Sequence, residues 1–328
     1  MTTPPHPSMN VQPSYDSLWQ KRLKALGAVW PEFLAGETEA LHKARVASRR
    51  IREALPVVGA NAPRAKIKKL RKQLRSLTRS LGPIRELDVE LGMLEEQGAQ
   101  DDVSRSALSL VRREVAARRL ALRDRLGEEP PVADVKKLIK KLERVAETKD
   151  KGRKARSHEQ ADHEQAWRAA LGLALLRRAK RLKSTLDEAG PLYAPDRIHD
   201  VRIAAKKLRY ALEIAQDAGD TRARTIAKRL KREQQRLGRL HDLEALLKHV
   251  REAEASPRVG ARLADLTAFA DALERDCRQV HAEFVEHRDV MFECATDVRH
   301  QLVPAFSIAR FHQARAGARP KRRPAKRA

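Results

Sequence analysis

Residues 41–55 read LHKARVASRRIREAL, and residues 198–212 read IHDVRIAAKKLRYAL. The second stretch is an imperfect copy of the first, displaced by 157 positions. An internal repeat of this kind predicts a fold built from two related units. The aligned pairs keep a histidine, four basic positions and a leucine: His42 and His199, Arg45 and Arg202, Arg49 and Lys206, Arg50 and Lys207, Arg52 and Arg209, Leu55 and Leu212.

Each copy has the spacing of an amphipathic helix with a basic stripe. Positions i, i+3, i+7 and i+10 lie within about 80° of one another on an α-helix. A basic stripe on one helix is usually a solvated face, but its duplication with the sign of charge kept favours a binding surface. The stripes are His42, Arg45, Arg49, Arg52 and His199, Arg202, Lys206, Arg209; the adjoining faces suited to a core are Leu41, Ala44, Ile51, Leu55 and Ile198, Val201, Leu208, Leu212.

A second basic stripe follows each copy. On the next helix Lys68, Lys72 and Arg75 share a face, and at a shift of 156 they fall on Arg224, Lys228 and Lys231. Arg79 falls on Gln235, which makes the first half the more cationic one at this position. Solvated side chains that aid solubility are an equally good interpretation of this stripe.

These stretches resemble the CHAD family, the conserved histidine α-helical domain. The resemblance is carried by the first histidine and basic positions, by their partners in the copy, and by the downstream segments LGPIRELDV (81–89) and LGRLHDLEAL (237–246). It extends over roughly residues 15 to 305. It implies two helical bundles that face each other across a basic cavity and bind inorganic polyphosphate through the duplicated histidines and basic residues.

Composition also favours a polyanion as the partner. The 328 residues carry 69 lysines and arginines and a net charge of +25, and the chain is long enough for two domain-sized units. Aromatic residues make up only 4% of the chain, which counts against single-stranded nucleic acid, whose bases stack on aromatic side chains. Two cysteines without a secretory signal fit a cytoplasmic protein, and no apolar run is long enough for membrane insertion.

Together these patterns predict an all-α protein of two pseudo-symmetric helical bundles facing a central basic groove, each with about four or more helices. We expect the first repeat over residues 15–155 and the second over residues 156–312. Residues 1–14 and the basic tail 313–328 are expected to be disordered. Residues 148–162 are interpreted as the linker between the repeats or as a polar helix extension.

Glycine and proline mark the helix boundaries that we expect. Gly82-Pro83 is expected to end or kink a basic helix over residues 64–81, because proline cannot donate a helical hydrogen bond. In the second repeat, separate helices are expected over residues 221–237 and 240–255, on either side of Gly238.

The predicted function is non-catalytic binding of inorganic polyphosphate, with recruitment to polyphosphate granules. No catalytic residue, metal or cofactor is expected, and smaller anions such as sulfate or phosphate are expected to enter the same site. Oligomeric state is left open. The candidate binding residues are His42, Arg45, Arg49, Arg50, Arg52, Lys68, Lys72, Arg75, Arg79, His199, Arg202, Lys206, Lys207, Arg209, Arg224, Lys228 and Lys231.

The residue types suggest how such a site would work. Arginine offers a planar fork for phosphate oxygens and lysine a compact charge, so the change from Arg49-Arg50 to Lys206-Lys207 predicts unequal halves. A bound anion is expected to favour the cationic forms of His42 and His199, which would strengthen binding below neutral pH. Binding is also expected to weaken strongly with salt.

Other functions fit less of the sequence. His199-Asp200 and His241-Asp242 are similar to the paired ligands of metal-dependent phosphohydrolases, but further convergent ligands are not apparent. A metal site at Cys277 and His281 is weaker, and there is no glycine-rich phosphate loop. The main alternative is a nucleic-acid-associated protein that binds phosphate backbones nonspecifically through its basic stripes and its basic tail.

Overall fold

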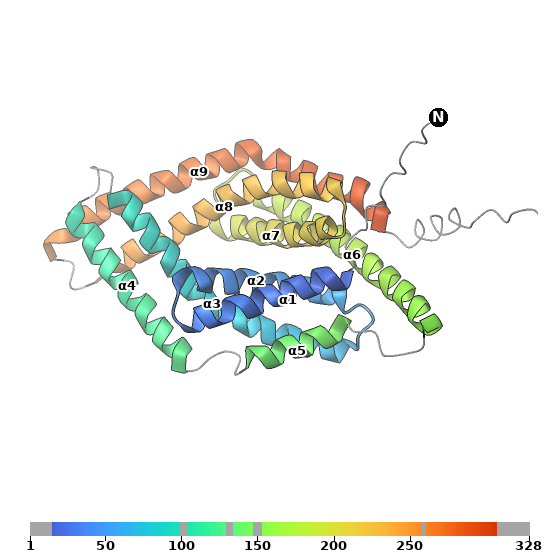
Figure 1. Cartoon of the computed structure of the whole chain (residues 1–328). Coiled ribbons are helices and arrows are strands. Elements are labelled where there is room, and N and C mark those ends of the chain that lie inside the picture. The colour runs from blue at the N-terminus through green and yellow to red at the C-terminus, as the bar shows by residue number, and fades with distance from the viewer. Residues whose placement is uncertain (1–14, 99–103, 129–133, 147–152, 257–259, 307–328) are drawn as a thin grey trace, which may run out of the picture.

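The computed structural model describes the chain except for residues 1–14, 99–103, 129–133, 147–152, 257–259 and 307–328 (Figure 1). The described residues form helices and no strand, which confirms the all-α prediction. The segments expected to be disordered, 1–14 and 313–328, lie outside the described residues. The α-helices are α1 (Tyr15–Leu34), α2 (Thr38–Val58), α3 (Arg64–Gly98), α4 (Arg105–Glu128), α5 (Val135–Ala146), α6 (Arg153–Ala189), α7 (Pro195–Asp217), α8 (Thr221–Glu254) and α9 (Leu263–Asp297).

The helices form two related layers. In the first, α1 and α3 pack against α2 and α4 packs against α3; in the second, α6 and α8 pack against α7 and α9 packs against α8. The layers meet through α2 with α7 and through α3 with α8, so the two copies of the repeated stretch face each other across the middle of the molecule (Figure 1). Helix α5 is added to the first layer, where it lies against α1. The two pseudo-symmetric bundles are therefore confirmed.

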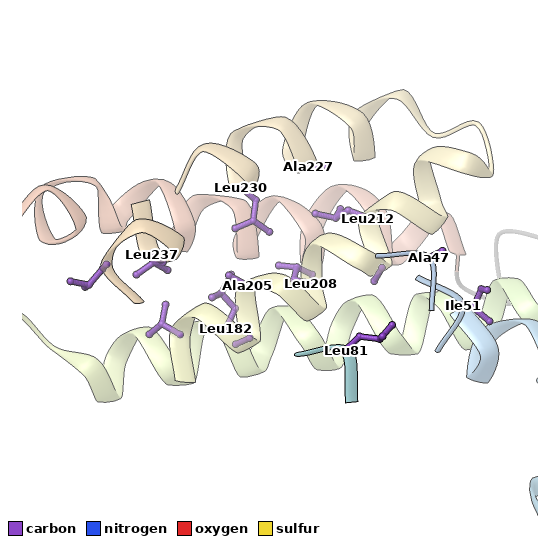
Figure 2. Packing of buried hydrophobic residues seen from close by; sticks show 14 of the residues in the cluster. Ala47, Ile51, Leu81, Leu182, Ala205, Leu208, Leu212, Ala227, Leu230 and Leu237 are labelled. Atoms are coloured by element: carbon purple, nitrogen blue, oxygen red, sulfur yellow. The ribbon is translucent and has the colours of Figure 1, made fainter. Parts of the chain in front are cut away.

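The core is built from the apolar faces that the repeats predict. All eight of the predicted apolar positions on α2 and α7 are buried. The buried side chains of both layers join into one hydrophobic cluster, and Figure 2 shows part of it, with residues from α2, α3, α6, α7 and α8. Burial of these stripes fixes the rotation of α2 and α7 about their axes, and so decides which way the neighbouring basic stripes point.

Two expected helix ends are wrong. Helix α3 runs without interruption through Gly82-Pro83, and α8 runs through Gly238. Pro83 costs α3 a backbone hydrogen bond, roughly 3 kcal/mol in a helix interior. However, Leu81 and Ile84 on either side of it are both fully buried, and their burial offsets the absence of this bond. In each repeat one long helix therefore carries both the second basic stripe and the residues that follow it.

Polar contacts join the two layers outside the core. Arg22 Nη2 lies 2.5 Å from Asp217 Oδ2 between α1 and α7, and Arg118 Nη1 lies 2.7 Å from Glu252 Oε2 between α4 and α8. Because these contacts span more than 130 residues of sequence, no local pattern encodes them.

Helix α6 begins at Arg153 and so crosses the boundary predicted between residues 155 and 156. The polar segment before the second repeat is thus, from Arg153 on, an extension of a helix. Among the described residues, no helix is both long enough and apolar enough to cross a membrane.

Candidate polyanion-binding site

Four cationic side chains from the two copies meet between α2 and α7. Arg45 and Arg49 come from α2, and Arg202 and Lys206 from α7; we call these four residues the cation cluster. Arg202 and Lys206 lie one turn apart on α7, and Arg49 donates a hydrogen bond to Tyr210 of the same helix. The charges of the three arginines act on Lys206. The pKa of Lys206 is lowered to about 7, chiefly by burial and then by these charges. Asp242 has a smaller, opposing effect. The structure thus brings together four of the predicted site residues.

Helix α3 lies against the side chain of Arg45. The guanidinium of Arg45 lies so close to Gly82 that a Cβ atom there would stand 3.0 Å from Arg45 Nη1. Glu86, one turn further along α3, places its Oε1 3.8 Å from Arg45 Nη2. The pKa of Arg45 is lowered to about 10, first by burial and then by the charge of Arg49. Gly82 therefore provides space for the Arg45 side chain in the middle of a long helix.

Tyr210 connects the two copies directly. Arg49 Nη1 donates a hydrogen bond to the phenolic oxygen of this buried tyrosine at 3.0 Å. The guanidinium of Arg209 lies over the same ring, 5.1 Å from its centroid. Tyr210 was not among the residues predicted from the sequence. The available signal was that the two copies differ in residue type there, because Tyr210 aligns with the acidic Glu53.

Most of the carboxylates that act on the cation cluster lie beyond ion-pair distance, among the described residues. Within the described residues, the pair between Arg45 and Glu86 is the one ion pair shorter than 4 Å that any of its members makes. The buried Nε of Arg202 has no hydrogen-bond partner there. Asp242 on α8 acts on Arg202 and Lys206 from a greater distance, and its own burial raises the pKa of its carboxyl. The arrangement leaves donors and positive charge available to an anion.

The two repeat histidines lie beside the cluster. Burial and then the charge of Arg85 lower the pKa of His42, whose buried Nδ1 has no hydrogen-bond partner among the described residues. Burial and then Arg202 lower the pKa of His199, and its ring centroid is 5.3 Å from that of His241. The pKa of His241 falls to about 4 for the same reasons, burial first. All three rings are therefore neutral in the free protein near pH 7.

Other basic residues of the two repeated stretches are paired with carboxylates. Arg50 Nε lies 3.2 Å from Glu213 Oε2, and Arg209 bonds both to Glu213 and, at 2.6 Å, to Gln234. Arg52 lies 3.1 Å from Glu53, which also accepts a bond from Arg178 of α6 at 2.9 Å. These cations are neutralised within the fold, so the structure separates them from the cation cluster.

The second stripes are exposed on α3 and α8. Within the described part of the chain their side chains form no ion pair, and the same holds for Lys207 on α7. No hydrogen bond between described residues joins them to the cation cluster either. These residues are Lys68, Lys72, Arg75, Arg79, Arg224, Lys228 and Lys231.

The rings of His199 and His241 lie close together, but the residues considered for metal chemistry do not form a site with the other ligands that a metal would need, among the described residues. Asp200 pairs with Arg181 of α6, at 3.4 Å. Cys277 and Cys294 are buried in α9, where burial raises the pKa of their thiols to about 11 and about 12. Among the described residues, no three histidine, cysteine, aspartate or glutamate side chains are grouped so that they could hold a metal ion.

Comparison with known proteins gives one family and several solved structures, two of which are described. Residues 17–251 match the model of the CHAD domain. PptA from Streptomyces chartreusis is similar in fold, with a TM-score of 0.56 and 16% identity over 86% of this chain and 97% of that one. The crystal structure of the CHAD domain from the plant Ricinus communis has a TM-score of 0.53 and 22% identity, over 82% of this chain and 90% of that one. No curated protein matches the chain.

Proposed function

The chain belongs to the CHAD family, and from that premise we propose that it binds inorganic polyphosphate, without turning it over, at the cation cluster between its two repeats. The observation that carries the proposal is the presence of four half-buried cations with one carboxylate within 4 Å among the described residues. Like charges held together in a partly buried place repel one another and destabilise the fold. Such an arrangement is expected where a bound anion supplies the missing negative charge.

Polyphosphate matches this arrangement in its chemistry. It carries about one charge per phosphate and no bases, so its receptor needs fixed donors and few aromatic platforms. The guanidinium groups of Arg45, Arg49 and Arg202 provide forked donors, and Lys206 adds a compact charge. The exposed second stripes on α3 and α8 are proposed to guide the chain beyond the cluster through weaker, solvated contacts.

A titration of the full chain with fluorescent polyphosphate tests this function. Duplex DNA, added at equal phosphate concentration, serves as competitor, and a chain that stops at residue 314 serves as the second protein. We expect tight, salt-sensitive binding that the truncation preserves within about twofold, because the tail lies outside the repeats, and poor competition by DNA. Loss of binding in the truncated chain, or equal competition by DNA, would instead support the nonspecific nucleic-acid alternative.

Binding should also depend on pH, and the sign follows from the lowered pKa values. In the free protein Lys206, with a pKa of about 7, and the two repeat histidines are partly or wholly neutral above pH 7. A bound polyanion stabilises their protonated forms, so binding takes up protons and affinity rises as pH falls. We expect about a tenfold gain in affinity between pH 8.5 and pH 6.5.

Long polyphosphate is the probe for this pH series, because only its terminal phosphates titrate near pH 6 to 7. Lys206→Arg provides the control, since arginine stays charged throughout and should flatten part of the profile. A constant affinity of the unchanged protein from pH 6 to pH 8.5 would remove His42, His199 and Lys206 from this role.

We further propose that bound polyphosphate determines where the protein resides, by holding it on polyphosphate granules in the cytoplasm. A fluorescent fusion of the full chain is expected to concentrate on stained granules and to disperse when the polymer is removed by a polyphosphatase. Granule association that survives removal of the polymer would contradict recruitment by polyphosphate.

A further inference from the structure

Helix α5 presents a face made almost entirely of lysine. Its 12 residues read VKKLIKKLERVA, with five cations and one acid, Glu143, which is half-buried. All five cations are exposed, and within the described part of the chain none of them forms an ion pair. We call these residues the α5 face: Lys136, Lys137, Lys140, Lys141 and Arg144.

Burial of the apolar side of α5 decides where the α5 face points. At 100° per residue the five cations fall within about 140° of one another, on the side opposite the apolar residues. Trp19 of α1, itself buried, donates a hydrogen bond from Nε1 to the carbonyl of Leu142 at 3.0 Å. The helix is therefore held in one rotation, with its cations directed away from the core. Its buried apolar residues are Val135, Leu138, Leu142 and Val145.

The α5 face lies on the outside of the first layer. Figure 1 shows α5 at the edge of the molecule opposite α9. Helix α5 packs against α1 and α3, and Lys66 of α3 donates a hydrogen bond from Nζ to the carbonyl of Arg144 at 3.2 Å. Lys66 is exposed, so its charge adds to the α5 face. In the described residues the second layer has the four α-helices α6 to α9, and none of them matches α5.

The second stripe on α8 is also exposed, but carboxylates stand beside it. Arg222 pairs with Asp220 at 2.5 Å. Arg229 pairs with Asp297 at 2.8 Å and also with Glu293. These acids reduce the positive field over α8, whereas the cations of the α5 face are not paired within the described chain.

The composition of the α5 face favours lipid head groups over nucleic acid. Proteins that hold a DNA backbone combine basic residues with hydrogen bonds from serine, threonine, asparagine, glutamine or tyrosine, and α5 contains none of these five. Lysine is a compact, hydrated charge without the fork that holds a single phosphate, and it suits a diffuse anionic surface. A 12-residue helix is about 18 Å long. Lying along a bilayer, it brings all five cations within a Debye length, about 10 Å at 0.1 M salt, of the head groups.

We propose that the α5 face is an interaction surface for the anionic head groups of a lipid bilayer, on which the protein lies without insertion. The apolar side chains of α5 are packed into the core, so they do not enter the hydrocarbon. Adhesion is therefore electrostatic: it rises with the fraction of anionic lipid and falls with salt. Because α5 packs against α1 and α3, whereas the cation cluster lies between α2 and α7, this surface does not depend on polyphosphate binding.

The experiment measures co-sedimentation of the full chain with vesicles of phosphatidylcholine that contain about 30% phosphatidylglycerol. Changing Lys136, Lys137, Lys140 and Lys141 together to alanine is expected to weaken binding at least about tenfold, because each basic residue near the surface strengthens adhesion. The matched control removes the same charge from α8 and should weaken binding less than about threefold. Equal losses in the two folded variants would overturn the proposal. The control residues are Arg224, Lys228, Lys231 and Arg232.

Two further arms test other sources of binding. A chain that stops at residue 314 should keep its vesicle binding within about threefold. Loss of binding in that chain, with full binding in the α5 variant, would assign adhesion to the tail and contradict the proposal. Duplex DNA is titrated against the same variants: if the α5 variant loses affinity for DNA and keeps its affinity for vesicles, the α5 face binds nucleic acid and the proposal is wrong. Failure of the unchanged protein to bind polyphosphate would leave all these outcomes as they are.

Discussion

Replacing Arg45, Arg49, Arg202 and Lys206 together by alanine is expected to weaken polyphosphate binding by at least about 100-fold. A charge-assisted hydrogen bond contributes roughly 1.5–3 kcal/mol, so the absence of even two such bonds corresponds to this factor. The slope of log Kd against log salt concentration should fall by about three, because fewer counterions are released. Fluorescence titration at several salt concentrations measures both quantities.

A matched control separates the geometry of the cation cluster from net charge. Helix α5 carries four exposed lysines outside both stripes, so their change to alanine removes the same charge and should weaken binding less than about threefold. Circular dichroism should show that both variants are folded. Equal losses of affinity in the two variants would mean that the overall field of the protein, and not the cluster, binds the polymer. The control residues are Lys136, Lys137, Lys140 and Lys141.

Glu53→Ala is expected to be the most damaging single change to stability, lowering the free energy of unfolding by about 3–5 kcal/mol. The carboxylate of Glu53 is only 5% exposed and accepts bonds from Arg52 at 3.1 Å and from Arg178 at 2.9 Å. Removing it leaves two largely buried guanidinium groups without a counter-charge, since Arg178 is itself only 17% exposed. Urea denaturation, followed by circular dichroism, measures the effect.

The comparison for this change is Glu95→Ala. Glu95 also pairs with an arginine, at 3.0 Å from Arg112, but both side chains are about 60% exposed. Its removal should change the free energy of unfolding by less than about 1 kcal/mol. Similar small decreases in the two variants would show that the Arg52 and Arg178 groups regain water when Glu53 is absent, and the buried pair would then contribute little.

The same position shows why the two repeats are not equivalent. Where the first copy has Glu53, which neutralises neighbouring arginines, the second has Tyr210, which accepts a hydrogen bond from Arg49 across the interface. One copy therefore uses this place for charge balance and the other to orient a member of the cation cluster. The expectation of unequal halves was drawn from the change of arginine to lysine, and it remains a prediction about binding.

The sequence by itself determined the helical class, the repeat and the faces of its helices. Leu41 and Ile51 on α2, and Ile198 and Leu208 on α7, recur at helical spacing, and burying such a stripe is the dominant favourable term in packing a helix. Local turn signals were less reliable. Gly82-Pro83 was expected to interrupt α3, but a helix with buried apolar side chains on both sides of the proline tolerates the absence of one hydrogen bond.

Only the tertiary structure decided which basic residues are free of carboxylates. Arg49 and Arg50 are adjacent in the repeated stretch, yet Arg49 joins the cation cluster and Arg50 pairs with Glu213. That division depends on how α2 lies against α7, through contacts between residues about 160 positions apart. Periodicity places a side chain on a face of its own helix, whereas its charge balance is set by the neighbouring helix, whose position follows from packing across the whole core.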